Sequence, residues 1–333
     1  MKTLALLASV VFTFSAAAQD TMKAIQATAF GGPEVLKLED VAKPVPRDGE
    51  ALVRVFAAGV NPVDWKIREG KLQGMTPPPP FIPGYDVAGV IDSMGPSDGG
   101  TKLKLGDSVY AYLALTAGGG YAEYVCVPLK TLAKKPQKAN WSEAAATPLA
   151  ALTAWQALFD QAKLQPGQTV LVHGAAGGVG HFAVQFAKAK GAKVIATASS
   201  TNHEFLKSLG ATVLIDYKTS KFEEVIKPGE VDVVLDTIGG DTQTRSFPLI
   251  RKGGTLVSIV QPPDAAKCKE LGINGKVFLV QPSGTELAEI AKLIDENKVT
   301  PHVSAELPLA EAAKAQEMSK SGTTRGKIVL KVR

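Results

Sequence analysis

The glycine-rich stretch at residues 169–180, TVLVHGAAGGVG, constrains the fold of this chain more than any other. It opens with a short run of apolar, β-branched residues, which is typical of a strand buried on both faces. A turn of glycine, alanine and valine follows, and residues 181–190 then have helical propensity. A strand, a glycine turn and a helix in this order predict a site for a dinucleotide pyrophosphate. Helix N–H groups point at the phosphates there, and glycine lets the backbone come close.

The turn departs from the usual G-x-G-x-x-G pattern, because Ala175 stands where the first glycine is expected. Taken alone, such a turn also fits an ordinary glycine-rich loop, so the neighbouring segments decide the interpretation. The predicted phosphate-binding residues are Gly174, Ala175, Gly177, Gly178, Val179 and Gly180.

A second predicted strand, at residues 193–198, is followed by small hydroxyl and amide side chains. NAD sites usually place an acidic residue roughly 20 residues after the glycines, where it binds the ribose 2′-hydroxyl. The first acid here is Glu204, which already belongs to the next helix. A hydroxyl-rich turn without a carboxylate can accept a 2′-phosphate, so we expect NADP rather than NAD. The turn has no arginine or lysine of its own, and a plain turn capped by Ser199 or Thr201 is the alternative.

Strands and helices alternate around the glycine turn, which predicts an α/β fold with a doubly wound, Rossmann-type parallel sheet. Its expected strands are the one before the glycines and residues 193–198, 211–215, 231–236, 254–260 and 276–280. The first part of the chain is rich in short strands with glycine at the bends, which predicts a small β-barrel. Its strands are expected within residues 22–38 and at 51–58, 85–93, 105–110 and 121–128. Helices are expected at 64–69, 141–159, 286–297 and 309–321, and a last strand at 326–332.

Composition excludes several classes of function. The 333 residues are enough for two ordinary domains, and the formal net charge of +5 is mild. Lysine and arginine are spread along the chain without a basic, aromatic block, so no nucleic-acid partner is expected. The two cysteines, Cys126 and Cys268, have no Cys or His partners at metal-ligand spacing, which argues against a zinc site or a disulfide framework.

Residues 1–18 have the outline of a secretory signal peptide. A positive charge at Lys2 precedes an apolar run, and an A-x-A pattern ends at Ala18. The segment is too short to span a membrane, and no span is expected elsewhere. It predicts a mature N-terminus at Gln19 and a periplasmic or secreted protein. A start at Met22 and a cytoplasmic location, where NADPH is made and recycled, are the alternative.

Nine motifs, in family order, resemble the medium-chain dehydrogenase/reductase superfamily and, within it, the zinc-free quinone oxidoreductase group. They are GVNPVDWKIREG (59–70), PGYDVAGV (83–90), GDSVYA (106–111), GGGYAEYV (118–125), TPLAALTAW (147–155), HGAAGGVG (173–180), DVVLDTIGG (232–240), KGGTLVSI (252–259) and TRGKIVL (324–330). The resemblance implies a GroES-like catalytic domain at 22–148, completed by 282–333, and an NADP-binding Rossmann domain at 149–281. It also implies a homodimer.

The departures from the superfamily's zinc enzymes concern the metal ligands. Zinc alcohol dehydrogenases of the superfamily have a cysteine where this chain has Asn61, and Gly-His-Glu where it has Gly84, Tyr85 and Asp86. The four-cysteine structural zinc loop is also missing. Neither Asn61 nor Tyr85 replaces a thiolate or an imidazole as a zinc ligand, so no metal is expected.

The resemblance implies a reductase that passes hydride from NADPH to a quinone or an α,β-unsaturated carbonyl. Such acceptors need orientation beside the nicotinamide more than a Lewis acid. An enoyl thioester reductase is an alternative of the same class, and a non-catalytic NADPH-binding protein, like the lens crystallins built on this fold, is an alternative of another class.

The resemblance also implies roles for individual residues. Those expected to place the acceptor and its developing negative oxygen are Asn61, Asp64, Tyr85 and Tyr121. Those expected near the nicotinamide are Thr153, Gly253 and Gly254, and those expected at the 2′-phosphate are Ser199, Asn202 and Tyr217. Family members often have a lysine near Asn202, which this chain lacks. The ordinary interpretation of Asn61 is a turn residue, and that of Asp64 is a helix cap.

Overall fold

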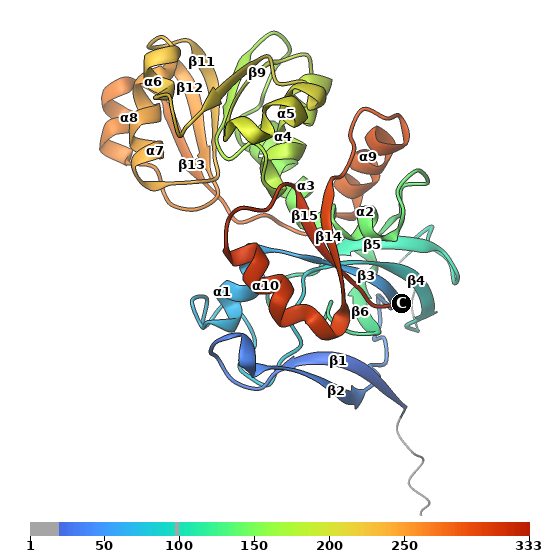
Figure 1. The fold of residues 1–333 in the computed structure, drawn as a ribbon. Coiled ribbons are helices and arrows are strands. Elements are labelled where there is room, and N and C mark those ends of the chain that lie inside the picture. Colours follow the sequence, from blue (N-terminus) through green and yellow to red (C-terminus); the bar gives the residue numbers. More distant parts are fainter. Residues whose placement is uncertain (1–19, 97–99) are drawn as a thin grey trace, which may run out of the picture.

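The computed structural model describes residues 20–96 and 100–333, which form two bodies packed against each other (Figure 1). We call residues 149–281 the parallel-sheet body and the remaining described residues the barrel body. The signal peptide predicted at residues 1–18 lies outside the described residues. Among the helices of the described chain, none is both long enough and apolar enough to cross a membrane.

The parallel-sheet body contains six strands in the order β10-β9-β8-β11-β12-β13, with every neighbouring pair parallel. The strands are β8 (Thr169–Val172), β9 (Lys193–Ala198), β10 (Val213–Asp216), β11 (Val231–Asp236), β12 (Ile250–Ser258) and β13 (Asn274–Val277). The helices around them are α4 (Gly178–Ala189), α5 (His203–Leu209), α6 (Phe222–Val225), α7 (Gly240–Ser246) and α8 (Ala265–Leu271). This arrangement confirms the predicted Rossmann-type sheet.

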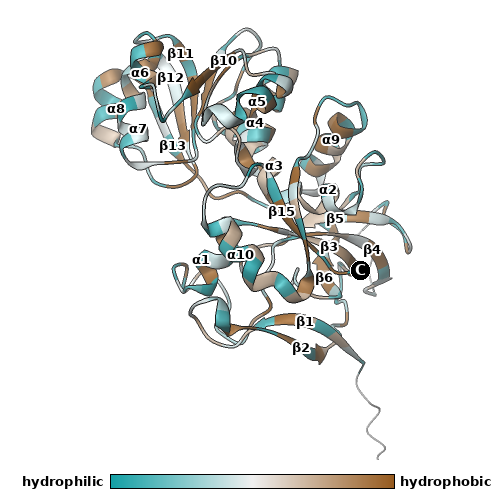
Figure 2. Ribbon diagram, viewed as in Figure 1, coloured by the Kyte–Doolittle hydropathy of each residue, from teal (hydrophilic) through white to brown (hydrophobic). Residues whose placement is uncertain are grey.

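Strand β8 is buried on both faces, as its sequence predicted. Val170 and Val172 join a cluster of buried residues that both bodies share, whereas Leu171 joins a second cluster on the opposite face. Alternate residues of a strand point to opposite faces, so a run without polar residues is what two covered faces require. Figure 2 shows hydrophobic residues along the strands of both bodies and many hydrophilic ones on the helices and turns around them.

The barrel body is built from a second sheet in the order β14-β15-β3-β4-β5-β7, with β6 paired to β3 and a separate hairpin of β1 and β2. Its strands in the first half of the chain are β1 (Thr21–Ala27), β2 (Leu36–Ala42), β3 (Glu50–Val60), β4 (Asp86–Met94), β5 (Ser108–Tyr112), β6 (Tyr124–Pro128) and β7 (Ala133–Lys134). Helix α1 (Pro62–Arg68) follows β3 directly. Single 3-10 turns occur at Pro33–Val35, Leu129–Thr131, Ser200–Asn202, Phe247–Leu249 and Leu309–Glu311.

The C-terminal part of the chain returns to the barrel body. It consists of α9 (Gly284–Asp295), β14 (Val303–Pro308), α10 (Ala312–Lys320) and β15 (Lys327–Lys331). Strand β15 pairs antiparallel with β3, with Ile328 opposite Val60. Figure 1 shows these two strands, far apart in the sequence, side by side. The start of β15 therefore lies next to the end of β3.

Several predicted boundaries were wrong. The helix expected at 141–159 is divided into α2 (Trp141–Ala145), α3 (Pro148–Trp155) and a π-helical turn at Gln156–Gln161. Proline has no N–H to donate within a helix, so Pro148 begins a new one. The strand expected from residue 105 begins at Ser108, and the one expected at 276–280 ends at Val277. Strand β14 was not predicted at all.

Candidate functional site

The glycine turn joins the end of β8 to the start of α4, a helix of 12 residues. Its N-cap residue, Gly177, has no side chain to accept hydrogen bonds from the first-turn N–H groups. These groups and the helix dipole therefore remain available to an anion at this end of α4. The predicted residues from Gly174 to Gly180 thus lie together in one turn, with Gly178 and Val179 in the first turn of the helix.

Two glycines keep this turn folded against the helix. A Cβ atom at Gly180 would lie 2.3 Å from the Gly174 carbonyl oxygen and 2.6 Å from the Ala175 Cα, which no side chain could tolerate. Gly174 has a φ of +63°, in the left-handed region that favours glycine. Ala175 is buried, and its N–H donates to the Thr197 carbonyl at 3.1 Å, which fixes the turn to β9. The cradle fits the pyrophosphate of a dinucleotide.

The turn after β9 contains the residues predicted for the ribose end. Ser199 Oγ lies 2.9 Å from Thr201 Oγ1, and Asn202 Nδ2 donates to Ser199 Oγ at 3.2 Å. The fold brings in a carboxylate that the sequence did not predict there, because Asp216 Oδ2 accepts the Ser200 N–H at 3.1 Å. Tyr217, the next residue, is 61% exposed.

Arg325 also reaches this turn, although no basic residue was expected there. Its Nε donates to Asn202 Oδ1 at 2.6 Å and its Nη2 to the Thr201 carbonyl at 2.9 Å. Arg325 lies between α10 and β15, so it comes from the barrel body. The neutral side chains of the turn are therefore joined by one positive charge, which comes from Arg325.

Three of the four residues predicted for the acceptor site form one hydrogen-bonded group at the start of α1. The Asn61 N–H donates to Asp64 Oδ2 at 2.6 Å, and the Tyr121 hydroxyl donates to the same oxygen at 2.8 Å. Asp64 is therefore the helix-capping carboxylate of α1, in agreement with its ordinary interpretation. Burial raises the pKa of Asp64 to about 7, against the lowering effect of the Asn61 and Tyr121 hydrogen bonds.

Tyr85, the fourth of these residues, is buried near the same group. Its exposed fraction is 1%, and burial raises the pKa of its hydroxyl, with a smaller contribution from the negative charge of Asp64. The hydroxyl is therefore protonated at neutral pH and able to donate a hydrogen bond. We call Asn61, Asp64, Tyr85, Asp86, Tyr121 and Lys327 the buried polar cluster.

Lys327 and Asp86 hold the side-chain amide of Asn61 from its two ends. The Lys327 ammonium donates to Asn61 Oδ1 and to the Val60 carbonyl, the latter at 2.9 Å. Asn61 Nδ2 donates to Asp86 Oδ2 at 2.8 Å, and Lys327 Nζ lies 3.5 Å from the same carboxylate oxygen. Burial raises the pKa of Asp86 and lowers that of Lys327, and the attraction between the two opposes both shifts. The orientation of the amide is thus fixed.

Lys327 also connects the buried polar cluster with the glycine turn. A Cβ atom at Gly178 would lie 3.2 Å from Lys327 Cδ, so the lysine stem passes directly beside the start of α4. The preceding residue, Gly326, donates its N–H to the Ala176 carbonyl at 2.8 Å. A cofactor phosphate on the turn and an acceptor beside Asn61 would therefore be neighbours.

The three residues predicted near the nicotinamide do not lie together. Thr153 lies on α3 and donates to the Leu149 carbonyl at 2.7 Å, while the Leu149 N–H donates to Asp86 Oδ1 at 2.7 Å. Thr153 is thus one helical turn from the buried polar cluster. Gly253 and Gly254 precede Thr255, which pairs with Val233 in the first half of β11. Gly253 and Gly254 therefore lie toward the amino ends of the parallel strands, whereas the glycine turn follows the carboxyl end of β8. This position does not fit a place beneath the nicotinamide.

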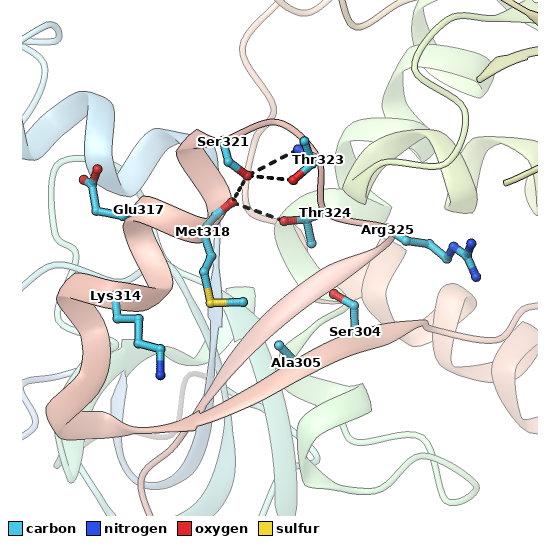
Figure 3. Close-up of a pocket in the computed structure, with 9 residues that line it drawn as sticks. All are labelled: Ser304, Ala305, Lys314, Glu317, Met318, Ser321, Thr323, Thr324 and Arg325. Carbon is cyan, nitrogen blue, oxygen red and sulfur yellow. Dashed lines mark hydrogen bonds between the residues drawn. The ribbon is translucent and has the colours of Figure 1, made fainter. Parts of the chain in front are cut away.

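A surface pocket of about 570 Å³ lies between α10, β14 and the loop before β15, and of the residues described above it includes only Arg325. It is lined by Ser304, Ala305, Lys314, Glu317, Met318, Ser321, Thr323, Thr324 and Arg325. Figure 3 shows the Arg325 side chain directed away from Met318 and Ser304. The pocket contains none of the residues predicted for the site, and we give it no role in the chemistry.

Sequence reasoning missed Asp86, Arg325 and Lys327. All three stand inside motifs that resembled the family, PGYDVAGV and TRGKIVL, so the motifs were the available signal. One other titratable residue, His173, has a structural role. His173 bonds Thr197 Oγ1 and Ser246 Oγ at 3.0 and 2.9 Å, and burial lowers its pKa to about 4. Across residues 20–96 and 100–333, no group of three or more His, Cys, Asp or Glu is arranged to hold a metal.

Comparison with known families matches both bodies. The family described as alcohol dehydrogenase GroES-like domain matches residues 47–137, and the one described as zinc-binding dehydrogenase matches residues 209–330. The quinone oxidoreductase of Mus musculus is 37% identical over 336 residues, which cover 95% of this chain and 99% of that protein. The NADPH-dependent alkenal/one oxidoreductase, chloroplastic, of Arabidopsis thaliana is 36% identical over 337 residues, or 97% and 83% of the two proteins.

A solved structure agrees with these relatives. The quinone oxidoreductase from Coxiella burnetii superposes with a TM-score of 0.86 at 38% sequence identity, over 94% of this chain and 100% of that chain. The match extends over both bodies.

Proposed function

This chain belongs to the zinc-free, quinone oxidoreductase-like group of the medium-chain dehydrogenase/reductase superfamily, and from that premise we propose that it reduces quinones or α,β-unsaturated carbonyls with NADPH. The chain is an oxidoreductase of this family, and the proposal adds the cofactor and the class of acceptor. One contact carries it: Lys327 passes beside Gly178 of the glycine turn and donates to Asn61 of the barrel body. This places a buried cation between the cofactor cradle and the acceptor side.

The glycine turn is suited to a nicotinamide dinucleotide, and the preference for NADPH is supported by the Arabidopsis relative named for it. When bound, NADPH supplies a hydride, and the electron pair of the acceptor's double bond moves onto its oxygen. The first-turn N–H groups of α4 would hold the pyrophosphate. The buried polar cluster of the barrel body would hold the acceptor.

Asn61 and Lys327 are suited to stabilise the negative oxygen that forms on the acceptor. The bonds to Lys327 and Asp86 fix the Asn61 amide and use one of its two N–H groups, which leaves the other as a donor. The Lys327 ammonium contributes positive charge in a water-poor environment, where it acts more strongly than in solvent. Both groups are in place before the acceptor arrives, so no reorganisation is needed during the reaction.

Asp64 is suited to supply the proton that completes the reduction. Its pKa of about 7 means that it holds a proton in a large fraction of molecules at neutral pH. Its Oδ1 atom is buried and has no hydrogen-bond partner within the described residues, while Tyr121 donates to Oδ2. The proton would leave Asp64 for the acceptor, with Tyr121 keeping the carboxyl group in position.

A substrate screen that follows NADPH absorbance tests this proposal. The purified protein is mixed with NADPH and, separately, a benzoquinone, a small enone and an enoyl thioester. We expect turnover with the quinone or the enone, and a lower kcat with unchanged NADPH binding in Asn61→Ala. Turnover of the thioester alone would favour an enoyl thioester reductase. NADPH binding without turnover of any acceptor would favour a non-catalytic binding protein.

We also propose that the chain forms a homodimer through β13, the edge strand of the parallel sheet. Within the described residues no strand pairs with its outer side. Val277 of β13 and Leu279 just beyond it are 46% and 48% exposed. Sedimentation of the purified protein tests this proposal. A monomer at all concentrations would contradict it.

We further propose that residues 1–18 are removed as a signal peptide and that the protein works outside the cytoplasm. The charge at Lys2, the apolar run and the A-x-A pattern support this proposal. The need for NADPH opposes it, because a chain exported unfolded would leave the compartment that makes the cofactor. The alternative is a cytoplasmic enzyme.

A further inference from the structure

The turn after β9 is the part of the site where an adenosine ribose would lie, because it follows the strand next to the glycine turn. Its hydroxyl and amide groups are arranged around a 3-10 turn, in which the Asn202 N–H donates to the Ser199 carbonyl at 2.9 Å. Ser199 and Thr201 contribute two hydroxyl groups, 2.9 Å apart. Such groups can donate hydrogen bonds to a phosphate, but they carry no charge to neutralise one.

Arg325 supplies the missing positive charge from the other body. Both of its acceptors are neutral, Asn202 Oδ1 and the Thr201 carbonyl, so these bonds position the cation without neutralising it. They use the Nε hydrogen and one Nη2 hydrogen, which leaves the Nη1 pair and the second Nη2 hydrogen for an anion. The guanidinium carbon lies 5.3 Å from the centre of the Phe205 ring, which supports the group from one side.

The loop before Arg325 is held in place by its own hydrogen bonds, which Figure 3 shows. Ser321 Oγ lies 2.9 Å from Thr323 Oγ1, and Thr324 Oγ1 donates to the Met318 carbonyl at 3.3 Å. After Arg325, the Gly326 N–H donates to Ala176 in the glycine turn. The arginine therefore comes from an anchored segment, with its charge preorganised at the ribose end of the cradle.

The carboxylate that the fold brings to the turn is already hydrogen-bonded. Asp216 accepts the Ser200 N–H at 3.1 Å through Oδ2 and the Lys218 N–H at 2.9 Å through Oδ1. These bonds, the Lys218 one foremost, lower its pKa. A carboxylate that selects NAD accepts a hydrogen bond from the ribose 2′-hydroxyl. Asp216 instead braces the backbone of the turn.

We propose that Arg325 binds the 2′-phosphate of NADPH and is the residue that makes the chain prefer NADPH to NADH. The proposal rests on the proposed function, because it assumes a nicotinamide dinucleotide on the glycine turn. It deepens that function by assigning the cofactor preference to one side chain. The planar guanidinium forms paired hydrogen bonds with phosphate oxygens, and Ser199 and Thr201 add hydroxyl donors.

Binding measurements on Arg325→Gln test the assignment without relying on turnover. Dissociation constants for NADPH and NADH are measured by fluorescence titration in the wild type, in Arg325→Gln and in Arg325→Lys. We expect the glutamine variant to lose about tenfold to a hundredfold in NADPH affinity, with NADH affinity changed less than about twofold. The lysine variant keeps the positive charge but lacks the forked guanidinium donors. Its NADPH affinity should lie between that of the wild type and that of Arg325→Gln.

A fragment probe and a matched variant complete the experiment. The probe 2′,5′-ADP carries the 2′-phosphate without nicotinamide. Its affinity should fall in Arg325→Gln in parallel with that of NADPH, whereas the affinity for 5′-AMP should not. Arg47→Gln removes one charge from an exposed site on the barrel body and should leave all four affinities unchanged. Salt should weaken binding of NADPH more than NADH in the wild type, and Arg325→Gln should remove that difference.

The possible failures are distinct. Equal losses for NADPH and NADH, or no loss for either in Arg325→Gln, would overturn the role of Arg325 while leaving the dinucleotide site intact. A wild-type protein that binds neither cofactor would overturn the proposed function itself. Should Arg325→Gln fail to fold, Arg325→Lys and the salt dependence of the wild type still decide the matter.

Discussion

The ammonium group of Lys327 donates a hydrogen bond to the side-chain carbonyl of Asn61, so the last strand of the chain meets the end of β3 through a buried cation. Lys327 is 3% exposed and its neighbour Asp86 is 0% exposed. Each charge is tolerated in the interior because the other lies beside it. Several expectations depend on this pair.

Removing the lysine should destabilise the protein, and removing both charges should repair much of the loss. Lys327→Met leaves the buried Asp86 without its cation, so we expect the free energy of unfolding to fall by about 3–5 kcal/mol. The double variant with Asp86→Asn should regain at least half of that loss, because no isolated charge remains. It should not regain turnover, since the Asn61 amide still lacks its partner. Urea unfolding and NADPH oxidation measure the two effects. Equal stability of the single and double variants would contradict the pairing.

Asp64 should make stability depend on pH. Its pKa rises from 3.8 to about 7 on folding, so between these values the folded chain holds a proton that the unfolded chain has lost. The stabilisation from this group is therefore complete below about pH 4 and declines as pH rises through 7. Asp64→Asn lacks the titrating proton, so its unfolding free energy relative to wild type should be higher at about pH 8 than at about pH 5, by one to a few kcal/mol.

Urea unfolding at the two pH values provides the measurement. Asp48→Asn, at an exposed position, is the control and should shift the wild-type curve equally at both pH values. A constant difference between Asp64→Asn and wild type would show that Asp64 keeps an ordinary pKa in the folded chain.

The glycine turn should not accept a side chain at residue 180. Gly180→Ala would place its Cβ 2.3 Å from the Gly174 carbonyl oxygen, so the turn and α4 must separate. We expect a loss of about 1–3 kcal/mol in unfolding free energy and a marked loss of dinucleotide binding. Gly177→Ala is the matched control, because its Cβ would meet only the same oxygen at 3.3 Å. Equal stability of the two variants would show that close packing at residue 180 is not required.

The enzyme should work without a metal. Asn61 and Tyr85 stand where related alcohol dehydrogenases have zinc ligands, and Lys327 already places positive charge beside Asn61 and Asp86. A second, divalent cation there would be repelled. Elemental analysis should find less than stoichiometric zinc, and NADPH oxidation should survive a strong chelator. Activity lost to the chelator and restored by zinc would refute this expectation.

The mature chain isolated from its native host should begin at Gln19. The expectation follows from the A-x-A pattern that ends at Ala18. N-terminal sequencing after cell fractionation gives a direct answer. A chain that begins at Met1 or Met22 in the soluble cytosolic fraction would show that the apolar segment is not a working signal.

The strands of the parallel sheet could be predicted because burial on both faces requires a run of apolar residues, which is visible in the sequence itself. A strand covered on both faces is mostly apolar, and β8 and β9 have that pattern apart from Thr169, Lys193 and Thr197. Strand β14, with the sequence VSAELP, lies at the edge of the other sheet and has polar residues at alternate positions. This alternation is a local strand signal, but it is short and ends at Pro308, and the pairing with β15 that completes the strand is a tertiary contact.

The site was predictable to the same extent. Asn61 and Asp64 lie within one motif that continues from a strand into a helix, so their proximity is local. Arg325 reaches Asn202 across 123 residues of sequence, and Lys327 reaches Asn61 across 266. No periodicity or composition reports contacts at such separations. The turn after β9 could therefore be predicted as a ribose site from the sequence, but the contact of Arg325 with that turn could not.

The short span from Arg325 to Lys327 sets a limit on how this chain can change its length. Arg325 is bonded to the turn after β9, Gly326 is bonded to the glycine turn, and Lys327 holds Asn61. Inserting or deleting a residue here would shift one end against the other by about 3.3 Å. Hydrogen bonds do not survive such a shift, so one of the three contacts would be lost. Insertions and deletions therefore cannot be absorbed in this span, and natural variation in length should occur in the preceding loop instead.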